Sequence, residues 1–273
     1  MIVNAPARPI ALTRRLKRLW RALAWLTKLV KTTTRTDLIA HSPQTEKLMQ
    51  QSSQDLLNIL NVRVELHGKI PDDLDGMLVV ANHVSWLDIL AMVSVHPMQF
   101  IAKQEIASWP VLGKIVSGMG TVFINRNQRK DTAKINSLIA QQLKEGQTVA
   151  FFPEARTSDG KGLRTFKGAL FQAAIDSHST VLPISLRYFN AEGKRSSHAA
   201  FIDGVSLFKS LWLILSEEET VIRIDCTAAL PAHSDDIEQS VTRFHLREKA
   251  QHQVAHLVLD DRDLKRLSEW NYL

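Results

Sequence analysis

Cysteine is almost absent from this chain of 273 residues, because Cys226 is its only one. A single thiol excludes an intramolecular disulfide framework and is typical of proteins in a reducing compartment. Long apolar runs are also missing: no stretch of about 18 consecutive apolar residues occurs, so we expect no membrane-spanning helix. Repeats and low-complexity linkers are lacking too, and the length fits one α/β domain of roughly 200 residues with a smaller appendage.

The chain also lacks the patterns of metal sites and of nucleic-acid-binding proteins. No His, Asp and Glu residues cluster at the spacing of metal ligands, and one cysteine adds little, so we expect no metal. The formal net charge of +6 and the pI of about 9.5 raise nucleic-acid binding as an interpretation. However, no nucleic-acid motif is recognisable and the aromatic residues form no stacking pattern interleaved with basic ones, so we expect no nucleic-acid partner.

What the chain does contain is a histidine and an aspartate five positions apart beside an apolar strand. Four such pairs occur, His67/Asp72, His83/Asp88, His198/Asp203 and His256/Asp261. The first, third and fourth fit a polar turn, a short strand at residues 199–202 and the end of a helix. His83 instead follows the apolar run Met77–Ala81 and precedes a helical pattern that starts at Ser85. This context favours His83 as a general base held by Asp88, with a helix-capping Asp88 and a core His83 as the alternatives.

Three further β-rich runs end in polar residues or proline, and helical patterns separate them. They are Gly120–Arg126, Thr148–Phe152 and Val181–Ser185. This alternation predicts an α/β fold with a mostly parallel mixed sheet flanked by helices, in which ligands gather beyond the strand ends. Arg126, Arg156, Arg164 and Lys167 follow such ends. A guanidinium group binds phosphate oxygens in pairs, so we expect an anionic head group there; for Arg164 we prefer an ordinary solvated charge.

These motifs together resemble the glycerophospholipid acyltransferases, a family typified by lysophosphatidic acid acyltransferase. The family's NHxSxxD, Gly-x-x-Phe-Ile-x-Arg, Phe-Pro-Glu-Gly-Thr-Arg-Ser and proline-centred blocks are similar to Asn82–Asp88, Gly120–Arg126, Phe152–Ser158 and Val181–Ile184. All four blocks occur in the family's order, between Met77 and Leu186. One block alone is a weak signal, whereas four in order are specific.

The resemblance implies a membrane-associated O-acyltransferase that moves a fatty acyl group to the free hydroxyl of a lysophospholipid. The donor is acyl-CoA or acyl carrier protein, used as a co-substrate, and no cofactor is expected. His83 takes the proton of the acceptor hydroxyl and Asp88 fixes the imidazole tautomer. The expected substrate-binding residues are Asn82, Phe123, Arg126, Glu154, Arg156 and Lys167. For Glu154, orienting the acceptor, binding one of the arginines and a local ion pair all remain open.

The third block departs from the family pattern. Where the family has Gly-Thr-Arg, this chain has Ala155, Arg156 and Thr157, so the glycine is lost and the arginine comes one position early. The resemblance associates that arginine with the substrate phosphate. The expected acceptor is lysophosphatidic acid, giving phosphatidic acid; the alternatives are lyso-ornithine lipid or another lysolipid, and an inert lipid-binding protein on the same fold.

The first 36 residues hold nine Lys and Arg and no acidic residue. At helical spacing, apolar residues fall on one side and basic residues on the other. The apolar positions are Leu16, Leu19, Trp20, Leu23, Leu26 and Val30, and the basic ones are Arg14, Lys17, Arg18, Arg21 and Lys28. A basic amphipathic helix with a tryptophan in its apolar stripe is typical of one lying in the interface of an anionic membrane leaflet.

Packing of this stripe on the main domain is the main alternative. A signal peptide is disfavoured because Arg21 and Lys28 interrupt the apolar stretch and no clear cleavage site follows. We favour the membrane surface, because the expected acceptor is a lipid. Residues 1–60 are therefore expected to form a helical, membrane-associating segment and residues 61–273 the catalytic domain. The expected location is the cytoplasmic face of the membrane, as a peripheral or monotopic protein.

Overall fold

The computed structural model describes residues 9–35, 42–68, 71, 73–104, 121–124, 131–233 and 241–259. Arg126 lies outside the described residues. So do Asp72 and Asp261, the aspartates of two of the four histidine–aspartate pairs.

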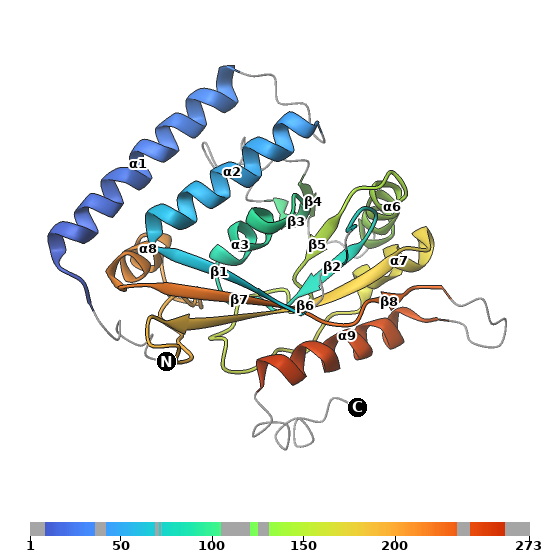
Figure 1. Cartoon of the computed structure of the whole chain (residues 1–273). Coiled ribbons are helices and arrows are strands. Elements are labelled where there is room, and N and C mark those ends of the chain that lie inside the picture. The colour runs from blue at the N-terminus through green and yellow to red at the C-terminus, as the bar shows by residue number, and fades with distance from the viewer. Residues whose placement is uncertain are drawn as a thin grey trace.

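Within the described residues, eight strands form one sheet (Figure 1). Its order is β1-β7-β6-β2-β5-β3-β4, and β8 pairs with β6 outside this path. The pairs β6–β7 and β6–β8 are antiparallel and all other described pairs are parallel. The strands are β1 (Val62–His67), β2 (Leu78–Ala81), β3 (Gln99–Lys103), β4 (Val122–Ile124), β5 (Val149–Phe151), β6 (Thr180–Asn190), β7 (Thr220–Cys226) and β8 (Leu230–Pro231). The prediction of a mostly parallel mixed sheet is confirmed.

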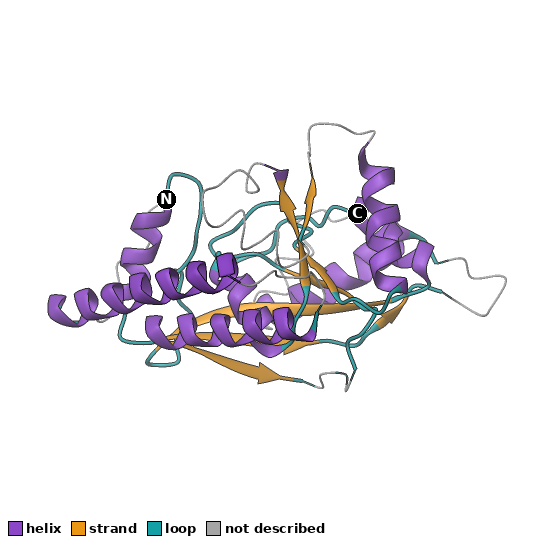
Figure 2. Ribbon diagram, turned by 90° about the horizontal axis from the view of Figure 1, so that it is seen from above, coloured by secondary structure: helices purple, strands orange, loops and turns teal. Residues whose placement is uncertain are grey.

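Helices cover both faces of this sheet, as Figures 1 and 2 show. The core of one face includes residues of α1 (Leu12–Arg35), α2 (Pro43–Leu60), α3 (Leu87–Val95) and α8 (Leu207–Ser216). The core of the other face includes residues of α6 (Asp131–Lys144), the 3₁₀ turn η1 (Ala169–Phe171), α7 (Gln172–Ser177) and α9 (Arg243–Val258).

The central strand β2 shows why its sequence is apolar throughout. Leu78 and Val80 belong to the core of one face, while Val79 and Ala81 belong to the core of the other. All four side chains are buried, because side chains alternate between the two faces of a strand and helices cover both faces here. The chain leaves this buried strand at residue 82, directly before the predicted catalytic histidine.

The N-terminal helix α1 packs on the rest of the protein through a narrow face. Ala22 and Leu29 are buried there, and the indole of Trp25 donates a hydrogen bond to the Ser52 carbonyl of α2. Four of the six residues of the predicted apolar stripe are exposed, with Trp20 reaching 73% exposure, while Leu19 packs against the core. The helix therefore packs on the domain and still presents apolar side chains to solvent. No described helix is both long and apolar enough to cross a membrane.

The second helix, α2, contributes to the same core as the helix that follows β2. Its residues Met49, Leu57 and Leu60 are buried in the cluster that also contains Leu87 and Met92 of α3. The predicted N-terminal segment, residues 1–60, thus includes an element that shares the core of the catalytic part. The division of the chain at residue 60 stays a prediction.

One local prediction differs from the structure, and one helix was missed. Residues 199–202 form no strand, because their backbone bonds the turn after β2: the N–H of Phe201 donates to the carbonyl of Val84 at 2.8 Å. The helix α8 was not predicted, although its N-cap signal is present in the sequence. The hydroxyl of Ser206 accepts a hydrogen bond from the N–H of Lys209, as an N-cap residue does.

Candidate active site

His83 lies on the turn that connects β2 to α3, and Asp88 lies in the first turn of α3. Nδ1 of His83 is 2.8 Å from Oδ2 of Asp88, so the predicted return of Asp88 toward the ring is confirmed. The same oxygen accepts the backbone N–H groups of Val84 at 2.7 Å and Ser85 at 2.9 Å. Asp88 is fully buried. The carboxylate thus both caps the turn and holds the imidazole.

The second carboxylate oxygen of Asp88 has a partner that the sequence analysis missed. Oδ1 accepts a hydrogen bond from the hydroxyl of Tyr188 at 2.5 Å. Tyr188 lies in β6, which continues to Asn190, well beyond the predicted strand Val181–Ser185. Burial is the main cause that raises the pKa of Tyr188, and the nearby charge of Asp88 raises it further. The phenol therefore stays protonated and acts as a donor.

The imidazole of His83 is stacked and has one free edge. Its ring lies 3.9 Å from the ring of Phe152 with an interplanar angle of 5°, and Phe152 in turn stacks on Phe100. Because a carboxylate only accepts hydrogen bonds, its contact assigns the proton of the neutral ring to Nδ1. Within the described part of the chain no hydrogen bond reaches Nε2, and the side chain is 19% exposed. A lone pair on Nε2 can therefore meet an external hydroxyl.

Asn82 attaches the turn that carries His83 to β6. Its side-chain amide donates to the carbonyl of Leu186 at 3.0 Å, and its oxygen accepts the N–H of Leu186 at 2.7 Å. Asn82 is fully buried. Its substrate-binding role stays a prediction, while its observed contacts fix the position of the turn.

Glu154 attaches the same turn to the third block. One carboxylate oxygen accepts the N–H of His83 at 2.7 Å, and the other accepts the N–H of Arg164 at 2.7 Å. Burial raises the pKa of Glu154 to about 7, although the two backbone hydrogen bonds act in the opposite direction. These contacts show a role that the sequence analysis did not consider, the binding of two backbone N–H groups, and the three roles left open by the sequence stay predictions.

The altered third block forms an irregular loop. Ala155 adopts φ of +64°, a left-handed conformation that favours glycine, which the family pattern has at this position. Arg156 is exposed and its guanidinium lies 3.8 Å from the exposed carboxylate of Asp203. Thr157 stands where the family has arginine, and its hydroxyl donates to the carbonyl of Phe201. The early arginine thus points into solvent, while the threonine ties the loop to its neighbour.

The remaining predicted site residues are less closely connected to this unit. Lys167 is exposed, and its backbone N–H donates to the carbonyl of Pro153 at 2.9 Å. Phe123 is partly buried on β4. The structure therefore joins His83, Asp88 and Glu154 in one hydrogen-bonded unit, while the substrate-binding roles of Phe123 and Lys167 stay predictions.

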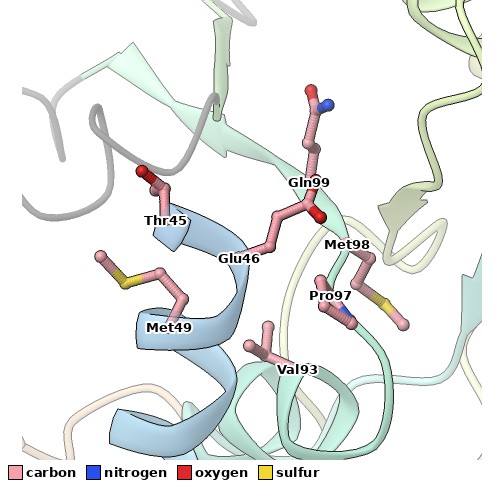
Figure 3. A pocket seen from close by; sticks show the side chains of 7 residues that line it. All are labelled: Thr45, Glu46, Met49, Val93, Pro97, Met98 and Gln99. Carbon is pink, nitrogen blue, oxygen red and sulfur yellow. The ribbon is translucent and has the colours of Figure 1, made fainter. Parts of the chain in front are cut away.

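A small cavity lies between α2, α3 and β3 (Figure 3). It has a volume of about 30 Å³, room for no more than a few water molecules. Its lining residues are Thr45, Glu46, Met49, Val93, Pro97, Met98 and Gln99. Neither His83 nor Asp88 lines it, so this cavity is not part of the candidate site.

A histidine held by a buried carboxylate, with its other nitrogen unpaired among the described residues, can remove a proton from a hydroxyl that a substrate brings. Residues 61–187 match the family model described as Acyltransferase. A 1-acyl-sn-glycerol-3-phosphate acyltransferase of Neisseria meningitidis is 44% identical over 92% of this chain and 95% of its own length. The chain therefore belongs to the acyltransferase family, which confirms the resemblance carried by the four blocks.

Not all relatives are named for the same lysolipid acceptor. A lyso-ornithine lipid O-acyltransferase of Pseudomonas aeruginosa is 32% identical over 78% of this chain and 79% of its own length. The crystal structure of a 1-acyl-sn-glycerophosphate acyltransferase from Thermotoga maritima has a TM-score of 0.64 and 20% identity. That match covers 93% of this chain and 95% of the other. The structural likeness shows the fold, and the relatives show that this chain is an acyltransferase.

Proposed function

We propose that this acyltransferase moves a fatty acyl group from acyl-CoA or acyl carrier protein to lysophosphatidic acid, giving phosphatidic acid. The observation that carries the proposal is the 2.8 Å contact between Nδ1 of His83 and buried Asp88, which leaves Nε2 facing outward as a base. The 44% identity to the relative from Neisseria meningitidis supports this acceptor.

In the proposed reaction, the acceptor hydroxyl binds to Nε2 of His83 and attacks the thioester carbonyl. Nε2 takes the hydroxyl proton as the new C–O bond forms, and Asp88 stabilises the imidazolium through Nδ1. The tetrahedral intermediate then collapses, the C–S bond breaks, and the thiolate leaves as free thiol after taking the proton from His83. Because the substrate hydroxyl is the nucleophile, this path needs no covalent enzyme intermediate.

For the head group we propose Arg126, Arg156 and Lys167 as phosphate-binding residues. Arg156 is free to turn toward a ligand, because its carboxylate partner Asp203 is 93% exposed and 3.8 Å away. The altered third block supports a second candidate function, acylation of lyso-ornithine lipid, which the name of the Pseudomonas aeruginosa relative also supports. A lysolipid panel separates the two acceptors.

For α1 we propose a position in the membrane interface on the cytoplasmic face. Its exposed apolar side chains include Leu16, Trp20 and Leu23. Basic residues Arg14, Lys17, Arg21, Lys28 and Lys31 are exposed along the same helix. Apolar burial and attraction to anionic lipids act together in such a helix. This position would bring the domain to the bilayer that holds its acceptor.

The test is thiol release from acyl-CoA, with and without lysophosphatidic acid in anionic vesicles. Native protein is compared with His83→Ala and with His252→Ala, a matched change of an exposed histidine on α9. We expect release that needs the acceptor and is lost in His83→Ala while His252→Ala keeps it. Release that persists in His83→Ala would remove the general-base assignment. If folded native protein releases no thiol, acyl carrier protein donors and lyso-ornithine lipid are tested next, and failure of all combinations would favour an inert lipid-binding protein.

A further inference from the structure

Tyr188 contacts the catalytic carboxylate without reaching the surface. Its hydroxyl lies 2.5 Å from Oδ1 of Asp88, and its side chain is 2% exposed. Tyr188 therefore contacts the carboxylate that holds His83, although it lies 100 residues after Asp88 in the chain.

The two oxygens of Asp88 differ in how many donors hold them. Oδ2 accepts three hydrogen bonds, from His83, Val84 and Ser85, whereas among the described residues Tyr188 is the one donor to Oδ1. A carboxylate buried with an unsatisfied oxygen is unfavourable. The hydroxyl of Tyr188 therefore fixes the rotation of the carboxylate and keeps both oxygens satisfied.

The strand β6 brings this hydroxyl to the site in a defined register. Leu186, two residues earlier, is bound at both its N–H and its carbonyl by the side chain of Asn82. Leu186 and Tyr188 share one face of the strand, since both belong to the core on the α3 side of the sheet. The turn that carries His83 is thus aligned with Tyr188 through the backbone of β6.

We propose that Tyr188 is a positioning residue for acyl transfer, which acts through Asp88. Its hydroxyl keeps Oδ2 directed at Nδ1 of His83 while the ring gains its proton and positive charge. This inference rests on the proposed role of His83 as the general base. Because Tyr188 is buried, its removal should alter the rate of the chemical step and leave substrate binding intact.

The first test is Tyr188→Phe, which deletes only the hydroxyl. We expect kcat to fall about tenfold, equivalent to about 1.4 kcal/mol in the barrier, with KM for both substrates within about twofold. Ser185→Ala is the matched control, because Ser185 lies on the same strand as Tyr188 and also has a buried hydroxyl. That hydroxyl donates to Asp225 at 3.1 Å. The control should keep the native kcat. Unchanged kcat in Tyr188→Phe, or a raised KM instead, would overturn the proposal.

The second test asks whether the effect passes through Asp88. In an Asp88→Asn background, Tyr188→Phe should change the residual kcat by less than about twofold, because the carboxylate it positions is already gone. An undiminished tenfold loss there would show an independent effect and overturn the proposal. Activity that survives in His83→Ala would instead overturn the proposed function itself, so the two failures are distinguishable.

If Tyr188→Phe fails to fold, the hydrogen bond can be altered without removing it. The chain has two tyrosines, so Tyr272→Phe protein labelled with 3-fluorotyrosine carries the label at Tyr188 alone. Fluorine makes the phenol a stronger donor to Asp88. A change in kcat of more than about twofold relative to unlabelled Tyr272→Phe protein supports the proposal, and identical kcat overturns it.

Discussion

The carboxylate of Glu154 accepts a 2.7 Å hydrogen bond from the backbone N–H of His83, which lies 71 residues earlier in the chain. Its other oxygen accepts the N–H of Arg164 at the same distance. One buried side chain therefore holds the turn of the candidate base against the loop of the third block. Glu154 therefore contacts the backbone of His83 rather than its ring.

This contact predicts a pH dependence of stability. Burial raises the pKa of Glu154 from 4.5 to about 7, so between these values the folded protein binds more protons than the unfolded chain. Stability should therefore fall as the pH rises through that window, by up to about 3 kcal/mol. Glu154→Gln should lack this fall. The measurement is urea unfolding of both proteins across the window.

The control for this experiment is Glu145→Gln, which replaces an exposed glutamate directly after α6. That variant should keep the native pH dependence. If Glu154→Gln shows the same fall in stability as the native protein, Glu154 is not its source. The variant should also lose activity, because an amide offers one acceptor oxygen where two backbone donors need partners.

Ala155 is expected to be replaceable by glycine with a gain in stability. Its φ of +64° is disfavoured for a residue with a Cβ atom by about 1–2 kcal/mol. Ala155→Gly should therefore stabilise the protein by about 1 kcal/mol in urea unfolding. Gly146→Ala is the reverse control: its φ is +81°, nothing lies within 4 Å of the added Cβ, and the change should destabilise. A neutral or destabilising Ala155→Gly would contradict this account of the loop.

Arg156→Ala is expected to weaken acceptor binding without affecting the fold. Its ion pair with Asp203 is exposed and 3.8 Å long, so it contributes less than about 1 kcal/mol to stability. We expect KM for lysophosphatidic acid to rise about tenfold with kcat nearly constant, the pattern for a group that binds ground state and transition state alike. Lys161→Ala removes another exposed charge between the same strands and should leave KM unchanged. An unaltered KM in Arg156→Ala would remove this residue from the head-group site.

Contacts between residues close in the sequence could be predicted from it, whereas contacts between distant segments could not. The apolar run before His83 and the helical pattern after it are local signals, and they were enough to predict that Asp88 returns to the ring. Tyr188 was missed because its contact with Asp88 joins segments 100 residues apart. One signal for it is present in the sequence: large side chains recur at every second position, which extends the strand pattern beyond the predicted end. These residues are Leu182, Ile184, Leu186 and Tyr188.

The third block and the N-terminal helix show that the sequence did not predict backbone angles or the packed face of a helix. The loss of glycine at Ala155 was visible in the sequence, but only the backbone angle shows that this residue occupies a left-handed position. Likewise, spacing predicted an apolar stripe between Leu16 and Val30, but not which face of the helix packs on the domain. The buried face is formed by Ala22 and Leu29, beside the predicted stripe.

This division of faces in α1 leads to a membrane-binding experiment that leaves the fold intact. Deleting the helix would remove the packed residues Ala22 and Leu29, whereas Leu16, Trp20 and Leu23 are 49%, 73% and 49% exposed. The variant Leu16→Ser/Trp20→Ser/Leu23→Ser should therefore keep the native unfolding temperature. It should bind anionic vesicles at least about tenfold more weakly, because each apolar side chain transferred from water contributes about 1.5–3 kcal/mol.

The matched control is Leu138→Ser/Phe244→Ser, which removes exposed apolar side chains from α6 and α9 on the other face of the sheet. We expect this control to bind vesicles as the native protein does. Raised salt should weaken binding of the native protein, because the basic residues of α1 contribute through screened attraction to anionic lipid. If the α1 variant binds vesicles like the control, the membrane contact lies elsewhere and the exposed stripe has another partner. If its binding falls while acylation of a short-chain, water-soluble acceptor is unchanged, α1 acts by bringing the active site to its lipid and not by shaping that site.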